Sequence, residues 1–226
     1  NVRAVGRTGL TEVESKSIFK AYGLPIVRSD LATSEDEAVK LAESYGYPIV
    51  MKIVSPDILH KSDAGGVKVN INSEAEIREA YQTILTNAKA HKPDAEIHGI
   101  LVQEMAPWGT ETIVGSVNDV TFGPTVMFGL GGIFVEVLKD VVFRVAPISD
   151  MEAIKMLDAI RGAPILDGVR GEGPRDKKAL AEVLSKYAHM ISDLGEHIQE
   201  SDANPILVYE VGKGVKIVDA RIILKD

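Results

Sequence analysis

The sequence feature that constrains the fold most strongly is a lysine at the end of a short predicted strand. A glycine turn and a second predicted strand follow it. Residues 48–51 are apolar and lead into Lys52, and residues 67–71 form a second β-rich run. Gly65 and Gly66 can turn the chain sharply and bring backbone N–H groups close to a ligand. The pattern predicts two strands joined by a loop that has room for a binding site.

The loop between these strands carries His60, with Lys61 and Asp63 beside it. A lysine that faces a glycine turn can bind phosphate oxygens, and a loop histidine can act as a nucleophile or a base. The simpler alternative is that the glycines form only a hairpin turn and that His60 is a solvated polar residue. A Walker A loop is excluded, because no GKS or GKT follows the glycines and the segment runs from strand to strand.

The composition narrows the class of protein. The chain has 226 residues, of which 45% are apolar and 26% are charged, as in ordinary soluble globular proteins. The net charge of −8 disfavours nucleic acid or an anionic membrane as the main partner. An anionic ligand would then need local cations, which Lys52, Lys61 and Lys68 could provide. The absence of cysteine excludes disulfides and thiolate chemistry and fits a cytoplasmic protein, and we expect neither a membrane span nor a signal peptide.

The first part of the chain alternates helices with short strands. Thr11 begins a predicted helix that Gly23 ends, and residues 24–27 are predicted to form a short strand. Ser34 and Ser73 are each followed by acidic residues, which predicts two further helices capped by these serines.

After about residue 99 the pattern changes to short strands with short turns, which favours antiparallel pairing. We expect an α/β (α+β) fold of two lobes, with a ligand in the cleft between them. The smaller lobe would comprise residues 22–98, and the larger lobe residues 1–21 and 99–226. The strands expected in the larger lobe cover residues 99–105, 111–117, 125–128, 141–145, 206–211 and 215–224, and its helices cover residues 150–159 and 177–195.

Gln103, Glu104 and Met105 end a strand at the predicted boundary between the lobes. Backbone groups at this place can bind the edge of a base, and the Glu104 carboxylate can accept a hydrogen bond from it. Alternatively, Glu104 is a surface residue at a strand end. Glu111 can accept hydrogen bonds from ribose hydroxyls, or it is an exposed strand residue.

A run of three glycines within residues 129–136 follows an apolar strand. It is not the dinucleotide-binding fingerprint, because no helix of a βαβ unit is expected after it. Such a run allows close backbone approach to another chain or to a phosphate. Arg144 and the loop of residues 161–170 add cations, which either contact a ligand or are solvated.

Asn204 and Asp219 are the most informative polar pair. If residues 212–214 turn the chain into a hairpin, Asn204 and Asp219 lie side by side on neighbouring strands. An amide oxygen and a carboxylate suit Mg²⁺, which prefers oxygen ligands and is usually shared with nucleotide phosphates. Alternatively, Asn204 only begins a turn and a backbone donor satisfies Asp219. A carboxylate in an apolar strand needs a partner in either case.

Together these residues resemble the ATP-grasp subunit of the nucleoside-diphosphate-forming acyl-CoA synthetases, the β subunit of ADP-forming acetyl-CoA synthetase. Succinyl-CoA synthetase β is a more distant relative. The resemblance covers essentially the whole chain, and the order and spacing of its motifs are specific. The motifs are LTEVESK at 10–16, PIVMK at 48–52, HKSDAGGV at 60–67, QE at 103–104, FGP at 122–124, FGLGGIFVE at 128–136, FR at 143–144, RGAP at 161–164, DANP at 202–205 and VDAR at 218–221.

The resemblance implies an ATP-grasp fold and a reversible reaction, in which acyl-CoA, phosphate and ADP give free acid, CoA and ATP. It implies Mg²⁺ as the metal and ADP or ATP as the nucleotide. The implied ligand residues are Lys52, Gly65 and Gly66 for the nucleotide phosphates, Gln103, Glu104 and Met105 for adenine, Glu111 for ribose, and Asn204 with Asp219 for Mg²⁺.

His60 matches the position where the ADP-forming enzymes have a histidine, whereas succinyl-CoA synthetase has glycines and an arginine in that loop. This favours the acetyl-CoA type and implies a second phosphohistidine at His60, because neutral imidazole is nucleophilic near pH 7. Lys52, Arg144 and Mg²⁺ would neutralise the transferred phosphoryl group. Asp63 or Glu136 would orient the imidazole. Alternatively, His60 only guides an incoming phosphohistidine loop by hydrogen bonding.

The family also implies a CoA-binding α subunit that carries its own phosphohistidine on a mobile loop, assembled with this chain as an α2β2 heterotetramer. Two other functions are compatible with the fold. Similar ATP-grasp segments in protein acyltransferases act as regulatory modules, and a third possibility is an ATP-binding scaffold for assembly. The joint presence of His60, Asn204 and Asp219 favours catalysis.

Overall fold

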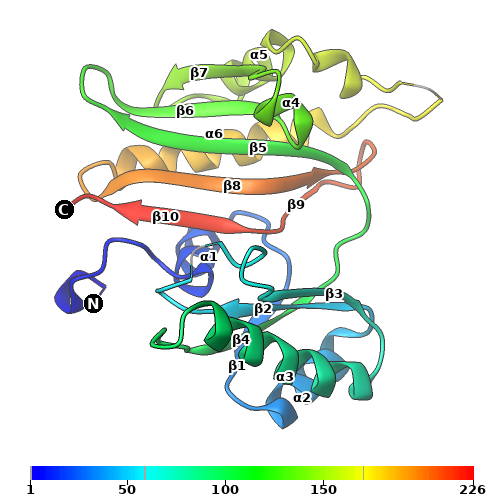
Figure 1. Ribbon diagram of the computed structural model, residues 1–226. Coiled ribbons are helices and arrows are strands. Elements are labelled where there is room, and N and C mark those ends of the chain that lie inside the picture. The colour runs from blue at the N-terminus through cyan, green and yellow to red at the C-terminus, as the bar shows by residue number, and fades with distance from the viewer. Residues whose placement is uncertain (1, 59, 170) are drawn as a thin grey trace. The chain divides into compact units, whose positions relative to one another are not determined.

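The chain forms two units, each built from one antiparallel sheet and its helices (Figure 1). The computed structural model describes residues 2–58, 60–169 and 171–226, apart from the side chains of residues 133 and 136. The larger unit comprises residues 1–10, 14–26 and 107–226, and the smaller unit comprises residues 11–13 and 27–106. The expected mixture of helices and antiparallel strands in two lobes is confirmed.

The sheet of the smaller unit has the strand order β1-β4-β2-β3 and is antiparallel throughout. Helices α2 and α3 pack on one of its faces, where Ile49, Met51 and Ile53 of β2 form a core with Ile77 and Ile84 of α3. Lys52 alternates with these residues and therefore points to the opposite face. The elements are β1 (Ser29–Ala32), α2 (Glu35–Tyr45), β2 (Ile49–Val54), β3 (Val67–Ile71), α3 (Glu74–His91) and β4 (Gly99–Glu104).

Serine side chains cap both helices of the smaller unit, as the sequence predicts. The hydroxyl of Ser34 accepts a hydrogen bond from the N–H of Glu37, and that of Ser73 accepts one from the N–H of Glu76. Each cap satisfies an N–H group that has no partner inside the helix. The caps fix where α2 and α3 begin, and hence where the strands before them end.

The sheet of the larger unit has the order β10-β8-β5-β6-β7, and β9 also pairs with β8. Helices α5 and α6 pack on one face of it. Helix α1 begins within the short segment that clusters with the smaller unit and continues in the larger unit. The elements are η1 (Arg3–Val5), α1 (Glu12–Ala21), β5 (Thr110–Asp119), β6 (Gly123–Leu130), α4 (Ile133–Glu136), β7 (Val141–Val145), α5 (Asp150–Ala159), η2 (Ala163–Ile165), α6 (Lys177–Asp193), β8 (Ile198–Val208), β9 (Val215–Ile217) and β10 (Ala220–Leu224).

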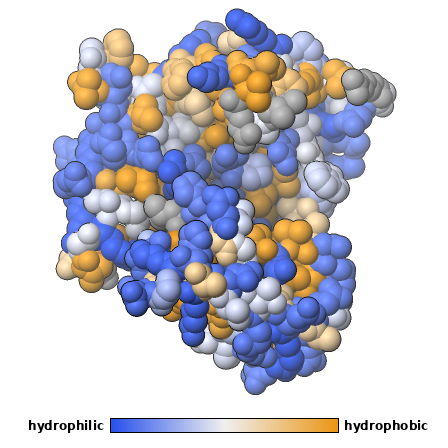
Figure 2. All heavy atoms as spheres, in the orientation of Figure 1, coloured by the Kyte–Doolittle hydropathy of each residue, from blue (hydrophilic) through white to orange (hydrophobic). Residues whose placement is uncertain are grey.

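The two faces of the larger sheet differ in character. On the helix-covered face, Tyr187 of α6 is fully buried, stacks edge-on against Phe19 and donates a hydrogen bond to Ser116. On the opposite face, Phe143 and Val145 are about half exposed. The hairpin between β5 and β6, which lies at the upper left of Figure 2, also exposes apolar side chains.

Three details differ from the sequence-based expectation. The first strand begins at Ser29 rather than within residues 24–27. Residues 99–104 were expected in the larger lobe, but β4 pairs with both β1 and β2 and lies in the smaller unit. The strand expected over residues 215–224 is interrupted between β9 and β10, at Asp219. Strand pairing is non-local, which explains why local patterns misplaced these boundaries.

No helix in the described ranges is both long and apolar enough to cross a membrane.

Asp176 ties the start of α6 to the turn between β8 and β9. Its carboxylate accepts hydrogen bonds from the N–H groups of Ala179, Gly212 and Gly214 at 2.9–3.1 Å. Burial alone would raise the pKa of this carboxyl group, but the three N–H groups outweigh burial and lower the pKa below the usual 3.8. The charged form of Asp176 is therefore the one that the fold stabilises.

Asp176→Ala is expected to lower the free energy of unfolding by about 2–4 kcal/mol at neutral pH, because a helix cap and the hydrogen bonds to two further N–H groups are lost. Since the folded-state pKa is lowered, the stabilisation is complete above the unfolded-state pKa and is lost as the pH falls through the folded-state value. Urea unfolding of wild type and Asp176→Ala between about pH 7 and pH 2 measures this. A stability difference that did not shrink toward the acid end would contradict the assignment.

Candidate functional site

Lys52 and Gln103 lie on the same face of the smaller sheet, opposite α2 and α3. Lys52 pairs with Leu101, and Gln103 stands two residues further along β4. Side chains two residues apart on a strand share a face, so both polar side chains point away from the helices. Both residues are buried, with 6% and 1% of their surface exposed. The face opposite the helices therefore carries two buried polar side chains that were predicted to bind the nucleotide.

Glu12, the first residue of α1, binds the ammonium groups of two lysines. Its Oε1 lies 2.9 Å from Nζ of Lys52, and its Oε2 makes a close ion pair with Nζ of Lys61. Glu12 is itself buried, with 7% of its surface exposed. Burial of charged groups requires such compensation, because each loses its hydration. The structure thus places two of the predicted phosphate-binding cations beside each other and adds a carboxylate that we did not predict.

The glycine turn brings the loop of residues 60–66 tightly against β2. A Cβ on Gly66 would lie 2.5 Å from Cγ2 of Ile53, and a Cβ on Gly65 would lie 2.7 Å from Nδ2 of Asn87. The N–H groups of Gly65 and Gly66 donate to the carbonyls of Ser62 and Lys61. Both glycines are therefore needed for close packing. In this structure their N–H groups bind the loop itself, whereas we had expected them to face a ligand.

His60 and Asp63 lie exposed in the same loop. The carbonyl of His60 accepts a hydrogen bond from the N–H of Ala64, which fixes the backbone on one side of the histidine. His60 is adjacent in sequence to Lys61, the second lysine on Glu12. An accessible imidazole in a loop that is anchored by a lysine can receive a phosphoryl group or donate one.

The predicted hinge is held by hydrogen bonds inside the smaller unit. The N–H of Glu104 donates to the carbonyl of Arg28, and the Glu104 carboxylate accepts from the N–H of Arg28 at 3.0 Å. The N–H of Met105 donates to the carbonyl of Pro48 at 3.3 Å. Glu104 thus joins β4 to the start of β1. Binding of adenine by Gln103, Glu104 and Met105 stays a prediction.

Asn204 and Asp219 are hydrogen-bonded neighbours in the larger unit. The N–H of Asn204 donates to the carbonyl of Asp219 at 3.3 Å, and the N–H of Val218 donates to the carbonyl of Pro205 at 3.0 Å. The side chain of Asp219 accepts from the N–H of Ala220. Their proximity matches the hairpin that the sequence predicts, while their binding of a metal stays a prediction.

Asp202 adds negative charge near this pair. It precedes Asn204 by two residues on β8, and Arg221 donates to its carboxylate at 2.7 Å. Burial raises the pKa of the Asp202 carboxyl group. The negative charges of Asp219 and Glu200 raise this pKa further, and Arg221 partly opposes the rise. A divalent cation relieves such crowding of carboxylates. The donor set of an amide oxygen and a carboxylate therefore fits Mg²⁺.

Within the described part of the chain, no group of three or more His, Cys, Asp or Glu side chains could bind a metal ion alone. This is consistent with a magnesium ion that takes one or two protein ligands and completes its shell with phosphate oxygens and water.

Arg144 lies on the other face of the larger sheet. It stands opposite the buried Val126 and donates from Nε to Glu152 of α5 at 2.9 Å. Asp202 pairs with Gly115, Gly115 pairs with Met127, and Met127 pairs with Phe143, so these four residues share one face of the sheet. Arg144 follows Phe143 in the same strand and therefore faces the other side. Arg144 and Asp202 therefore face opposite sides of one sheet. This differs from our prediction, which placed Arg144 at the transferred phosphoryl group together with the metal pair. The sequence alone does not show toward which face of the sheet an arginine in a strand points, because this depends on the register of the strand with its neighbour.

Glu111 lies exposed near the start of β5, and its carbonyl accepts from the N–H of Gly131 at 2.8 Å. A Cβ on Gly131 would lie 2.9 Å from Cβ of Glu111. The glycine run thus approaches a strand of its own unit closely. The side chain of Glu136 lies outside the described part of the structure, so its predicted role as an orienting group stays a prediction.

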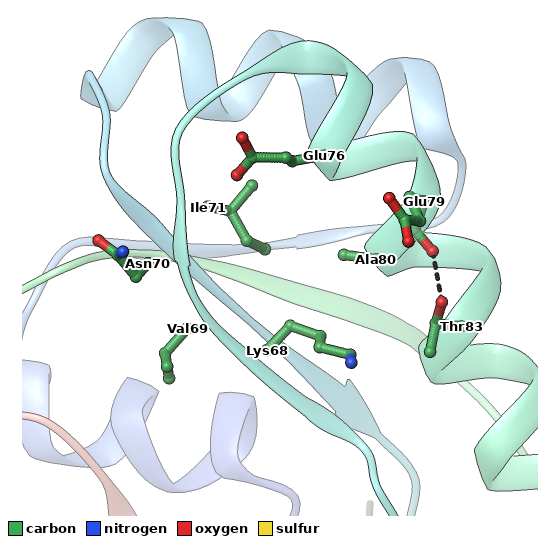
Figure 3. A pocket seen from close by; sticks show the side chains of 8 residues that line it. All are labelled: Lys68, Val69, Asn70, Ile71, Glu76, Glu79, Ala80 and Thr83. Atoms are coloured by element: carbon green, nitrogen blue, oxygen red, sulfur yellow. Dashed lines mark hydrogen bonds between the residues drawn. The ribbon is translucent and has the colours of Figure 1, made fainter.

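A small pocket lies between β3 and α3 (Figure 3). Its volume is about 170 Å³, which is below the roughly 300 Å³ at which ligand pockets begin. Lys68 pairs with Met51, so it shares the helix-covered face, and Figure 3 shows its side chain extending toward Thr83. Lys68 was expected to strengthen the cation cluster, but it points away from Lys52. The pocket is lined by Lys68, Val69, Asn70, Ile71, Glu76, Glu79, Ala80 and Thr83.

Glu12 and Asp202 belong to the sequence motifs at 10–16 and 202–205, but neither had a predicted role of its own. Glu12 has the sequence signal of any acidic residue in the first turn of a helix, where it complements the macrodipole. Asp202 could have been found, because it stands two residues before Asn204 on a strand and shares its face.

Comparison with known proteins agrees with this arrangement. The family model described as an ATP-grasp domain matches residues 1–224. The chain is 50% identical over 224 residues to subunit β of ADP-forming acetate–CoA ligase II from Pyrococcus furiosus, which covers 99% of this chain and 95% of that protein.

Two solved structures of the dinucleotide-forming acetyl-coenzyme A synthetase 1 from Candidatus Korarchaeum cryptofilum have the same fold. One, in complex with coenzyme A and Ca-AMPCP, superposes with a TM-score of 0.94 at 49% identity. The other, with coenzyme A and Mg-AMPPCP, superposes with a TM-score of 0.86 at 44% identity, and its phosphohistidine segment points towards the nucleotide binding site. Each match covers 99% of this chain and 96% of the other.

Proposed function

Because the chain belongs to the ATP-grasp family and, within it, to the β subunits of the ADP-forming acetate–CoA ligases, we propose that it is the nucleotide-binding half of such a ligase. The complete enzyme converts acyl-CoA, ADP and phosphate into free acid, CoA and ATP, reversibly. The observation that carries the proposal is the pair of lysines on the buried Glu12, one of which is adjacent in sequence to the exposed His60.

His60 is the phosphoryl carrier of this chain. A nitrogen of its imidazole forms a P–N bond to the phosphoryl group while the P–N bond to the phosphohistidine of the partner breaks. In the next step the bond at His60 breaks as an oxygen of the β-phosphate of ADP forms the new P–O bond. The ring returns to its neutral state, and ATP leaves. Lys52 and Lys61 neutralise the charge of the phosphates during both transfers.

Asn204 and Asp219 hold Mg²⁺, which supplies charge neutralisation at the nucleotide phosphates. Gln103, Glu104 and Met105 bind the adenine, and Glu111 binds the ribose. Asp63 and Glu136 are the candidates for orienting His60. We omit Arg144 from the site, because it faces α5 on the far side of its sheet.

The partner is a CoA-binding α subunit, and the assembly is an α2β2 heterotetramer in the cytoplasm. The proposal of a separate α subunit is supported by the similarity to proteins that are named as β subunits. A regulatory role in a protein acyltransferase is not favoured, since the similar proteins are ligases and ligase subunits.

Lys52→Met is expected to weaken binding of Mg-ADP by about 10- to 100-fold, because a charge-assisted hydrogen bond to phosphate contributes roughly 1.5–3 kcal/mol. Titration calorimetry on the purified chain measures the dissociation constant. Lys68→Met is the matched control, since Lys68 lies on the next strand but faces the helices. Equal losses in both variants, or no binding of Mg-ADP by wild type, would count against the proposed nucleotide site.

A further inference from the structure

Glu12 joins the two lysines of the proposed phosphate site. The carboxylate binds Lys52 through one oxygen and Lys61 through the other. The side chains of Glu12, Lys52 and Lys61 are 3%, 8% and 18% exposed. One carboxylate is therefore shared by two ammonium groups.

The three residues come from three separate segments of the chain. Glu12 begins α1, Lys52 lies in β2, one of the two inner strands of its sheet, and Lys61 follows His60 in the loop before β3. Charged side chains are rarely this buried unless a partner replaces their lost hydration. The contacts to Glu12 therefore determine the direction of Lys52 and anchor the loop that carries His60.

We propose that Glu12 is a positioning residue for phosphoryl transfer. It orients Lys52 and, through Lys61, sets where His60 lies relative to the phosphates of the nucleotide. The inference rests on the proposed function, because it assumes that the lysines bind phosphate. Glu12 acts through the lysines and does not touch the phosphate, since two anions in contact would repel each other.

A nucleotide phosphate competes with Glu12 for the same two cations. Lys61 is the more exposed lysine and lies in a loop, so it exchanges Glu12 for a phosphate oxygen, whereas Lys52 remains fixed by its strand. Removing the carboxylate of Glu12 reduces repulsion of the nucleotide, which raises its affinity. It also leaves Lys52 and Lys61 less ordered, which lowers the affinity, so the two effects oppose each other. The rate of transfer requires the cations and His60 to be correctly positioned, and no such compensation restores it.

Glu12→Gln tests this, because it removes the charge and preserves the size of the side chain. We expect the single-turnover rate of His60 phosphorylation by saturating Mg-ATP to fall about tenfold or more, since misplacement by about 1 Å is this costly. The dissociation constant for Mg-ATP should stay within about threefold of wild type. Glu12→Asp, which keeps the charge on a shorter side chain, should recover part of the rate.

Two further variants separate positioning from general damage. Glu14→Gln is the matched control: it makes the same change in the same helix, at a residue that pairs with Arg7, and should keep the wild-type rate. Lys61→Met leaves the pair of Glu12 with Lys52 in place and should reproduce the slow transfer. The double variant, Glu12→Gln with Lys61→Met, should then be phosphorylated no more slowly than the slower of the two single variants. Thermal unfolding shows whether each variant is folded.

The outcomes distinguish this inference from the proposed function. If wild type is phosphorylated and folded Glu12→Gln or Lys61→Met is phosphorylated at the same rate, the positioning role is overturned and the function stands. If wild type neither binds Mg-ATP nor becomes phosphorylated, the proposed function fails and the role of Glu12 fails with it.

Discussion

His60→Ala is expected to lower ATP formation from acetyl-CoA, ADP and phosphate by about 10³-fold or more, when the chain is assayed with its CoA-binding partner. Alanine has no nitrogen that can accept the phosphoryl group, so transfer between the partner and ADP loses its carrier. Loss of a covalent nucleophile should affect kcat rather than KM for ADP, because the proposed phosphate and metal ligands remain in place. Steady-state kinetics with a coupled ATP assay measures both constants.

His91→Ala is the matched control for this experiment. His91 is an exposed histidine at the end of α3 in the same unit, and its removal should leave kcat within about twofold of wild type. A His60→Ala enzyme that kept more than about a tenth of the wild-type kcat would show that His60 only guides the phosphohistidine of the partner, because a guiding hydrogen bond is worth roughly 0.5–1.5 kcal/mol.

Asp219→Asn is expected to produce the second largest effect. The substitution keeps a side-chain oxygen for the N–H of Ala220 but removes the charge that we propose binds Mg²⁺. We expect the Mg²⁺ concentration for half-maximal rate to rise, and the rate at a fixed low concentration of Mg²⁺ to fall, each by about 10- to 100-fold. Rates measured over a series of Mg²⁺ concentrations give both quantities.

Asp158→Asn makes the same chemical change at an exposed position of α5, where the carboxylate pairs with Lys177. It should leave the Mg²⁺ dependence unchanged. If Asp219→Asn behaved like this control, Asp219 would serve only to hold the backbone at Ala220, and the metal ligands would have to be sought elsewhere.

The parts of the fold with local signals could be predicted from the sequence. Ser34 and Ser73 were identified as caps, because the capping hydroxyl and the acidic first turn are adjacent in sequence. The neighbourhood of Asn204 and Asp219 was also predictable, since a glycine-bounded turn of a few residues leaves little freedom in strand pairing.

The parts that depend on distant pairing could not be predicted. Strand β4 belongs to the smaller unit because it inserts between β1 and β2, and nothing local to residues 99–104 indicates this. Arg144 has the sequence pattern of any strand residue, and only the register with β6 shows that it faces α5. The ion pairs of Glu12 join residues 40 and 49 positions apart in the chain. An acidic residue at the start of a helix does not by itself indicate such long-range ion pairs.

The most direct test of the central claim is a phosphorylation assay on this chain alone, with γ-labelled ATP and Mg²⁺, comparing wild type with His60→Ala. Phosphohistidine is labile in acid and stable in base, which distinguishes it from a phosphoserine. The account predicts acid-labile label on wild type and none on His60→Ala. Binding of ATP without any label, even when a CoA-binding partner and acetyl-CoA are supplied, would contradict it.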